Sequence, residues 1–360
     1  MEQARKAGVL VAMSGGVDSS VAAYLVQAAG FPCQGVTMRL LPEDNSRNTA
    51  DAEAVCQRLH IPFSVLDLRE EFENEVIAKF IRVYQSGGTP NPCVDCNRCL
   101  KFSRLLNEAE RAGLFYVATG HYAQTDYEKA TGRWLLKKAL DIGKDQSYFL
   151  YTLTQKQLSH IQFPLGGMEK QQVRELADRL GFVNAKRRDS QDICFIPDGD
   201  YGAFMEAYTG TPCPAGDFLD LKGRVVGRHQ GAVRYTLGQR KGLGLSMGEP
   251  VYVCGKNMEE GTVTVGPERA LYSREILVEE LNWIALEAFT APLRLNVKTR
   301  SRQQEQPAML FPESGNRVRV VFDEAQRAVT PGQAAVFYHG NVVIGGGTIL
   351  EVQGGADNGL

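Results

Sequence analysis

Residues 12–20 read AMSGGVDSS and stand between an apolar run and an amphipathic segment. The apolar run at 9–13 predicts a short buried strand. Residues 21–29 predict a helix, with Gly30 placed to end it. The stretch therefore predicts a strand–loop–helix unit near the start of the chain.

The composition of this loop favours binding of a phosphate. Gly15 and Gly16 let the backbone approach a ligand closely, and unpaired N–H groups at the helix start attract anions. Ser14, Ser19 and Ser20 add hydroxyl donors. The loop lacks the lysine of GxxxxGK[ST] and does not match GxGxxG, so it predicts a different class of nucleotide site.

The alternation of strands and helices continues through the first third of the chain. Further strands are predicted at 33–41, 63–68 and 115–119, and further helices at 50–60, 70–85 and 97–112. Strands alternating with helices predict an α/β domain with a doubly wound parallel sheet. This alternation fades after about residue 120.

The pattern changes near residue 201. Residues 222–248 contain seven glycines, six Lys or Arg and no acid. Short alternating segments between turns then predict strands at 293–298, 317–322, 334–338 and 342–350. We expect an α/β nucleotide-binding domain at 1–203, a small central domain at 204–273 and an antiparallel β-barrel at 274–360, with a frayed tail from 354.

The composition limits the classes of protein to which the chain can belong. The chain has 360 residues, 43% of them hydrophobic and 23% charged, with a net charge of −2. No apolar run approaches the roughly 20 residues that cross a bilayer, and no signal peptide precedes the first strand. We expect a cytoplasmic monomer. In a reducing compartment its eight cysteines favour metal binding or catalysis over structural disulfides.

Two segments carry the cysteines of interest, 89–102 (TPNPCVDCNRCLKF) and 186–196 (KRRDSQDICFI). The prolines of the first segment predict extended chain before a helix that starts near Asn97. Cys96 would then lie at a helix N-terminus, where the dipole, with Arg98 and Lys101, favours the thiolate. Cys194 follows three consecutive cations, and from its apolar neighbours alone it is as well explained as a buried inert thiol.

Together these motifs resemble the bacterial tRNA-uridine 2-sulfurtransferases, a branch of the PP-loop (adenine nucleotide α-hydrolase-like) family. The resemblance covers nearly the whole chain in one order. The matching pieces are SGGVDSS at 14–20, TPNPCxxCNRxxKF at 89–102, ATGHYA at 118–123, GKDQSYFL at 143–150, DSQDICFI at 189–196, YTLGQRKGLG at 235–244 and TPGQAAVFY at 330–338.

The resemblance implies roles for individual residues. Cys96 would be the catalytic nucleophile and Cys194 the carrier of persulfide sulfur. ATP would be held by Ala12, Met13, Ser14, Gly15, Gly16, Val17, Asp18, Ser19, Met38 and Gly120. The target base would face Asn91, Pro92 and Cys93. The residues in contact with tRNA would be His121, Lys144, Asp145, Gln146, Arg300, Ser301 and Gln333.

The resemblance also implies the reaction. ATP with Mg²⁺ would adenylate the C2 oxygen of the wobble uridine in the tRNAs for lysine, glutamate and glutamine. Persulfide sulfur would then replace AMP, leaving 2-thiouridine and a Cys96–Cys194 disulfide for a reductant to reset. A sulfur-carrier protein or a cysteine desulfurase would supply the sulfur. The acid-free segment 222–248 and the cations Arg294, Lys298, Arg300 and Arg302 would contact phosphates.

Several alternatives stay open. Cys93, Cys96 and Cys99 have the spacing of the first ligands in a ferredoxin run, so Cys93, Cys96 and Cys194 are alternative ligands of a [4Fe–4S] cluster. With Cys99 added, four thiolates could bind zinc. A PP-loop ligase such as argininosuccinate synthetase would need neither Cys96 nor Cys194. A nucleotide-sensing or tRNA-binding protein would bind AMP without turnover.

Overall fold

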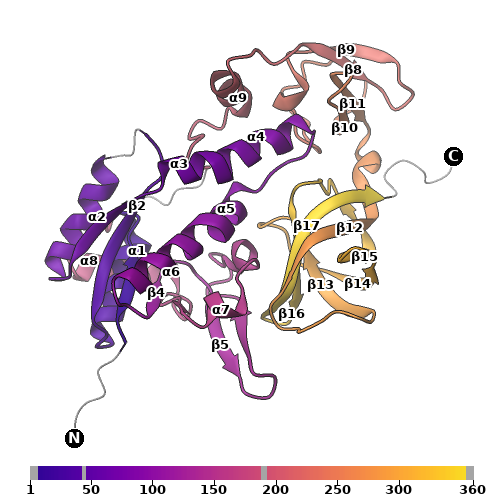
Figure 1. Cartoon of the computed structure of the whole chain (residues 1–360). Helices are drawn as coiled ribbons and strands as arrows, with labels where there is room; N and C mark the ends of the chain where they lie inside the picture. The colour runs from indigo at the N-terminus through magenta and orange to yellow at the C-terminus, as the bar shows by residue number, and fades with distance from the viewer. Residues whose placement is uncertain (1–6, 43–45, 188–192, 354–360) are drawn as a thin grey trace, which may run out of the picture.

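The computed structural model describes residues 7–42, 46–187 and 193–353. Within these residues the strands form three sheets (Figure 1). None of the described helices combines the length and the apolar character needed to cross a membrane. The tail predicted from 354 lies outside the described residues.

The first sheet has five parallel strands in the order β3-β2-β1-β4-β7. Their bounds are β1 Val9–Ala12, β2 Cys33–Arg39, β3 Phe63–Asp67, β4 Tyr116–Ala118 and β7 Ile161–Gln162. Both faces of β1 are buried: Val9 and Val11 pack on one side and Leu10 on the other. Such strands are continuous apolar runs, as the sequence indicated.

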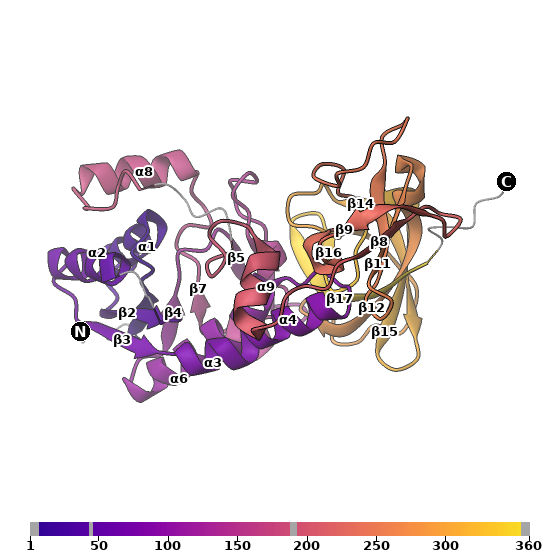
Figure 2. The ribbon, with the colours of Figure 1, turned by 90° about the horizontal axis from the view of Figure 1, so that it is seen from above.

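Helices cover both faces of this sheet (Figure 2). One face carries α1 (Val17–Ala28), α2 (Ser46–Arg58) and α8 (Lys170–Arg179). The other face carries α6 (Phe102–Arg111). The predicted doubly wound α/β architecture is therefore confirmed.

Two long helices beside the sheet contain π-helical turns. The first runs through α3 (Arg69–Phe72), η1 (Glu73–Ile77) and α4 (Ala78–Gln85). The second runs through α5 (Pro92–Asp95), η2 (Cys96–Lys101) and α6. The prediction that this helix starts near Asn97 is wrong, because it begins at Pro92. Proline suits the first helical position, where its missing N–H has no helical partner.

The central part begins with α9 (Tyr201–Thr209). A four-stranded sheet follows in the order β10-β11-β8-β9. Its strands are β8 Gly216–Leu219, β9 Val225–His229, β10 Tyr252–Asn257 and β11 Thr262–Gly266. The short helical turns η4 (Ala232–Arg234) and η5 (Glu268–Leu271) flank β10 and β11 in sequence.

The C-terminal strands form the predicted antiparallel barrel, which closes where β12 pairs with β17. The strands are β12 Tyr272–Trp283, β13 Leu293–Lys298, β14 Gln306–Glu313, β15 Arg317–Arg327, β16 Ala334–His339 and β17 Val342–Gln353. Alternate residues point into the barrel, as in β15, where Val318, Val320 and Phe322 are buried.

A hairpin from the N-terminal half extends the barrel sheet, which the sequence did not predict. It consists of β5 (Gln124–Glu128) and β6 (Arg133–Lys137), and β6 pairs antiparallel with β17. The chain then passes through η3 (Ser147–Leu150) and α7 (Gln155–Leu158) before returning to the parallel sheet at β7. The first and last parts of the chain therefore share one sheet.

Candidate active site

The loop between β1 and α1 has the geometry of an anion site. Gly15 has a φ of +71°, and a Cβ there would lie 2.3 Å from the backbone oxygen of Asn48, so glycine is required. Gly16 precedes the helix in an extended conformation and has no side chain to cap it. The hydroxyls of Ser14 and Ser19 lie 3.2 Å apart. N–H groups of the first turn are thus suited to phosphate oxygens.

Asp18, in the first turn of α1, is held by two residues from distant parts of the chain. The Nζ of Lys170 lies 2.7 and 2.8 Å from its two carboxylate oxygens, and the hydroxyl of Tyr122 donates a hydrogen bond of 2.8 Å. The Lys170 side chain is only 9% exposed. Sequence reasoning missed Lys170, whose one signal is its place at the start of an amphipathic segment. It supplies the cation that the loop itself lacks.

Met38 and Gly120 lie where β2 and β4 end, beside the loop that follows β1. Gly120 approaches the loop so closely that a Cβ would lie 2.7 Å from the backbone nitrogen of Ser19. Ligands of parallel sheets bind at the carboxyl ends of the strands. The structure therefore brings the predicted ATP residues to one edge of the sheet.

The segment that follows α8 forms hydrogen bonds to the loop between β1 and α1. Asn184 donates to the carbonyl of Gly15 at 2.8 Å and to the hydroxyl of Ser20 at 2.9 Å. Arg187 donates to the same carbonyl at 3.4 Å and to Asp51 at 3.1 Å. Seven residues after Arg187 the chain reaches Cys194, through residues 188–192, which lie outside the described part.

Cys96 is buried in the helix, not at its N-terminus. Burial raises the pKa of its thiol to about 11, and the charges of Cys194, Cys93 and Cys99 add to the rise, while Lys101 opposes it. The prediction of a dipole-stabilised thiolate is therefore wrong for this structure. The helix begins four residues earlier, at Pro92, and desolvation of the sulfur outweighs the nearby cation.

The cysteines of the two predicted segments do come together. Cys96 packs in one apolar cluster with Phe195 and Ile196, the residues that follow Cys194. Cys93 and Cys194 reach solvent, yet desolvation by the surrounding protein raises the pKa of each thiol. All of the eight described cysteines are free thiols, so the proposed Cys96–Cys194 bond is not formed in this structure.

Metal binding was an alternative for these cysteines. Among the described residues, no group of three or more His, Cys, Asp or Glu side chains is arranged to hold a metal ion. Cys93, Cys96 and Cys194 thus do not present a preformed ligand set for a cluster in this structure.

The residues predicted to face the target base lie at the start of the helix α5–η2–α6, which carries Cys93, Cys96 and Cys99 and is called the cysteine helix below. Asn91 precedes the helix and Pro92 occupies its first turn. The extended chain before them is fixed by the barrel, because Gln333 donates to the carbonyls of Thr89 and Pro90 at 2.9 and 3.1 Å. In this structure the Gln333 amide, predicted to contact tRNA, is engaged with the protein.

His121 lies between the cysteine helix and the sheet edge where the predicted ATP residues gather. Its Nδ1 lies 2.8 Å from the hydroxyl of Thr119, and its ring packs near Phe102 and Phe163. Burial lowers its pKa to about 3, with a further contribution from Lys101. The ring is therefore neutral at physiological pH and cannot attract phosphate as a cation.

Several of the other residues predicted to contact tRNA are engaged in hydrogen bonds within the protein. Asp145 accepts hydrogen bonds from Ala139 and Ser147, and Gln146 accepts one from Tyr122. They share a loop with Lys144, which is partly exposed. Arg300 and Ser301 follow β13 in the barrel, where Arg300 donates to the carbonyl of Ala328 at 2.7 Å.

Half of the cations in the acid-free segment 222–248 have acidic partners outside it. Arg224 pairs with Asp220, Arg228 with Asp217, and Arg234 with Glu206. The remaining three cations, which are exposed, are Lys222, Arg240 and Lys241. Arg294 in the barrel likewise pairs with Asp323.

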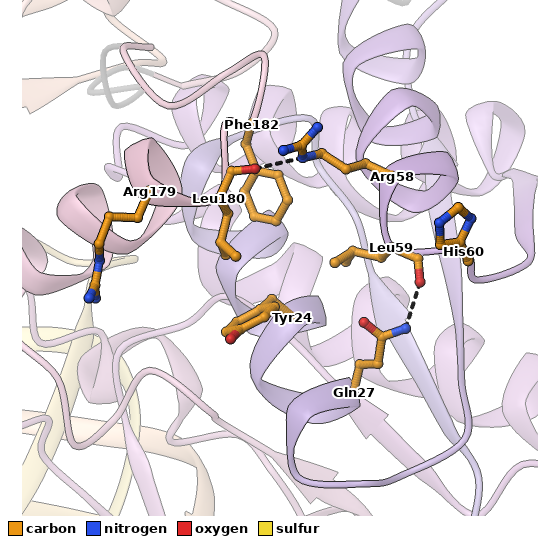
Figure 3. A pocket seen from close by; sticks show the side chains of 8 residues that line it. All are labelled: Tyr24, Gln27, Arg58, Leu59, His60, Arg179, Leu180 and Phe182. Carbon is orange, nitrogen blue, oxygen red and sulfur yellow. Dashed lines mark hydrogen bonds between the residues drawn. The ribbon is translucent and has the colours of Figure 1, made fainter.

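A shallow pocket lies elsewhere, between the C-terminal ends of α1, α2 and α8 (Figure 3). Its lining residues are Tyr24, Gln27, Arg58, Leu59, His60, Arg179, Leu180 and Phe182. Helices that follow parallel strands end at the edge opposite the strands' carboxyl ends. The pocket is therefore remote from the loop at 12–20 and contains none of the predicted site residues.

Comparisons with known families cover almost the whole chain. The model described as tRNA methyl transferase HUP domain matches residues 7–198. The tRNA methyl transferase PRC-barrel domain matches 202–267, and the aminomethyltransferase beta-barrel domain matches 273–349. A solved complex of a 4-thiouridine synthetase with RNA and bound ATP is 17% identical, with a TM-score of 0.36 over 53% of this chain and 45% of that one. That likeness is too weak to carry an argument.

Curated relatives match from end to end. The chain is 44% identical over 356 residues to the tRNA-specific 2-thiouridylase MnmA of Acetivibrio thermocellus, covering 96% of this chain and 99% of that protein. It is 46% identical over 354 residues to the MnmA protein of Moorella thermoacetica, covering 95% and 99%. On this evidence the chain belongs to the family of tRNA-specific 2-thiouridylases.

Proposed function

We propose that this protein uses ATP to convert the wobble uridine of the tRNAs for lysine, glutamate and glutamine into 2-thiouridine. The observation that carries the proposal is that the chain positions near the phosphate loop are close in sequence to the sulfur site. Asn184 and Arg187 donate to the carbonyl of Gly15 in the loop at 12–20, and Cys194, seven positions after Arg187 in the sequence, lies near Cys96. A site for ATP and a site for sulfur that lie this close together suit a reaction that first activates the uracil with ATP and then transfers sulfur to it.

The first step makes a poor electrophile reactive. The C2 oxygen of the uracil attacks the α-phosphorus of ATP, and pyrophosphate leaves. N–H groups at the start of α1, with Lys170 next to Asp18, would stabilise the negative charge of the departing group. Asp18 is a suitable carboxylate for Mg²⁺, which commonly binds one carboxylate together with substrate phosphates and polarises them.

The second step replaces the activated oxygen with sulfur. The terminal sulfur of a Cys194 persulfide attacks C2, and AMP leaves with the bonding electrons. The Cys96 thiol loses its proton and attacks the sulfur of Cys194, which releases 2-thiouridine and forms a Cys96–Cys194 disulfide. An external reductant returns both thiols, and a sulfur-carrier protein or a cysteine desulfurase supplies the next sulfur atom.

We also propose the domain division at 1–203, 204–273 and 274–360. The three sheets support it, with one exception: the hairpin β5–β6 belongs to the first range but extends the barrel sheet. Exposed Lys222, Arg240 and Lys241 are the cations of the central part that we propose for contact with tRNA phosphates.

The test is mass spectrometry of nucleosides from unmodified tRNA incubated with the protein, ATP, Mg²⁺ and a persulfide donor, namely a cysteine desulfurase with its cysteine substrate. We expect 2-thiouridine together with AMP and pyrophosphate, and no product when ATP is omitted. Absence of sulfur at C2 with the wild type would reject the function. With a persulfide donor, full activity of Cys194→Ala would reject the persulfide role. An anaerobic absorbance spectrum and an iron assay test the cluster alternative.

A further inference from the structure

Four charged side chains form a closed ring next to Cys96. Lys79 Nζ lies 2.8 Å from Asp95 Oδ1, which lies 3.2 Å from Arg98 Nη2. Arg98 Nη1 lies 3.4 Å from Glu280 Oε2, which lies 3.9 Å from Lys79 Nζ. The signs alternate around the ring, and its net charge is zero. Each cation therefore contacts both carboxylates.

The ring constrains the helix on both sides of Cys96. Asp95 immediately precedes the thiol residue, and Arg98 follows it by two positions in the π-helical turn. The Asp95 side chain is 8% exposed, so its charge depends on the two cations for compensation. Rotation or translation of the helix would separate these contacts.

Glu280 enters the ring from the barrel, 182 positions after Arg98. It lies in β12 where the pairing with β17 shifts register between Glu279 and Asn282. Its φ is +50°, a left-handed value that a residue with a side chain rarely adopts. Thr348 in β17 donates to its Oε2 at 2.9 Å. Bulges of this kind redirect a side chain, here toward the cysteine helix.

We propose that Glu280 is a positioning residue for sulfur transfer: it fixes the helix that carries Cys96 at one place relative to the barrel. The proposal rests on the proposed thiolation. The barrel carries Arg300, Ser301 and Gln333, for which contact with tRNA is predicted, and it also contacts the helix that carries Cys96. It would therefore set the thiol relative to a bound nucleotide. The contacts of the phosphate loop do not depend on Glu280, because Asp18 and its partners lie outside the ring.

The experiment compares Glu280→Gln with Glu279→Gln in the full chain. Glu279 is the matched control, because it lies one residue earlier on the same strand and its ion pair is with Arg317 of β15, at 3.7 Å. Three quantities are measured: tRNA-dependent pyrophosphate release in a single turnover, 2-thiouridine formed, and the alkylation rate of Cys96 by peptide mass spectrometry.

For Glu280→Gln we expect pyrophosphate release within about twofold of wild type. Sulfur transfer should fall by roughly 10- to 100-fold, the effect of misplacing a reacting group by about an ångström. Alkylation of Cys96 should become faster, because a loosened helix exposes a thiol that is otherwise buried. Glu279→Gln should match wild type in all three measurements.

Glu280→Gly separates positioning from stability. It removes the carboxylate and also relieves the left-handed backbone, so it should melt no lower than Glu280→Gln. Full sulfur transfer by Glu280→Gly, or equal transfer and alkylation in Glu280→Gln and Glu279→Gln, would overturn the proposal. If wild type forms no 2-thiouridine, the proposed function fails, whereas the alkylation comparison still decides whether Glu280 holds the helix.

Discussion

The contact between Gly120 and the ATP loop gives a quantitative prediction for Gly120→Ala. The new Cβ would lie 2.7 Å from the nitrogen of Ser19 and 2.8 Å from the carbonyl carbon of Asp18. Ordinary contacts of a Cβ begin at 3.4 Å, so the two segments must separate by about 0.7 Å. Both neighbouring atoms belong to the backbone, so no flexible side chain can absorb the change.

The displacement is large compared with the tolerance of a hydrogen bond. A bond of about 2.9 Å from the loop to a phosphate oxygen would lengthen to about 3.6 Å, beyond useful range. Losing one such bond to a charged group costs about 1.5–3 kcal/mol, which is roughly a 10- to 150-fold loss of ATP affinity. Overpacking should also lower the free energy of unfolding by about 1–3 kcal/mol.

Isothermal titration with ATP measures the affinity, and thermal melting confirms that the variant is folded. Gly167→Ala is the control, since a Cβ at Gly167 would meet no atom within 4 Å. It should bind ATP and melt like wild type. The reasoning is refuted if Gly120→Ala binds ATP as wild type does, or if the control loses the same affinity.

Three further predictions test the site. Lys170→Met should lower the free energy of unfolding in urea by about 2–3 kcal/mol, less than for a fully buried pair because Asp18 is 30% exposed; an unchanged midpoint would contradict it. Cys96, with its pKa raised to about 11, should be alkylated more slowly at pH 8 than the exposed Cys93, and its alkylation rate should increase as the pH rises. Equal alkylation rates of the two thiols at pH 8 would contradict the burial of Cys96. His121 has its folded pKa lowered to about 3, so the unfolded chain binds a proton first and stability falls as pH drops from about 6.5 toward 3. Between pH 7 and pH 5 the free energy of unfolding of His121→Asn should therefore fall by about 2 kcal/mol less than that of wild type, as measured by denaturant titration.

The ATP loop could be predicted because its signals are local. Glycines, hydroxyls and a capping position within nine residues determine both the turn and its ligand class. The parallel sheet followed from apolar runs whose period and length are equally local. Cys96 shows the limit of this reasoning. The dipole argument depended on a helix start that was predicted five residues too late, and on an exposure of the thiol that the sequence does not reveal.

The partners of the site residues lie far away in sequence. Asp18 and Lys170 are 152 positions apart, and Arg98 and Glu280 are 182 apart. No periodicity or motif relates such pairs, because they meet only when separate elements pack. The hairpin β5–β6 is similar, because β6 pairs with β17 only when the barrel packs against it.

The protonated state of Cys96 suggests an order for the proposed chemistry. A permanently ionised thiol would be exposed to oxidation before any tRNA arrived. Here burial keeps Cys96 as a thiol although Lys101 already acts to lower its pKa. Partial rehydration of the sulfur would therefore shift the balance toward the thiolate without a new base. We expect this change to follow adenylation, because Cys96 acts in the proposed sequence only after sulfur has reached the activated C2.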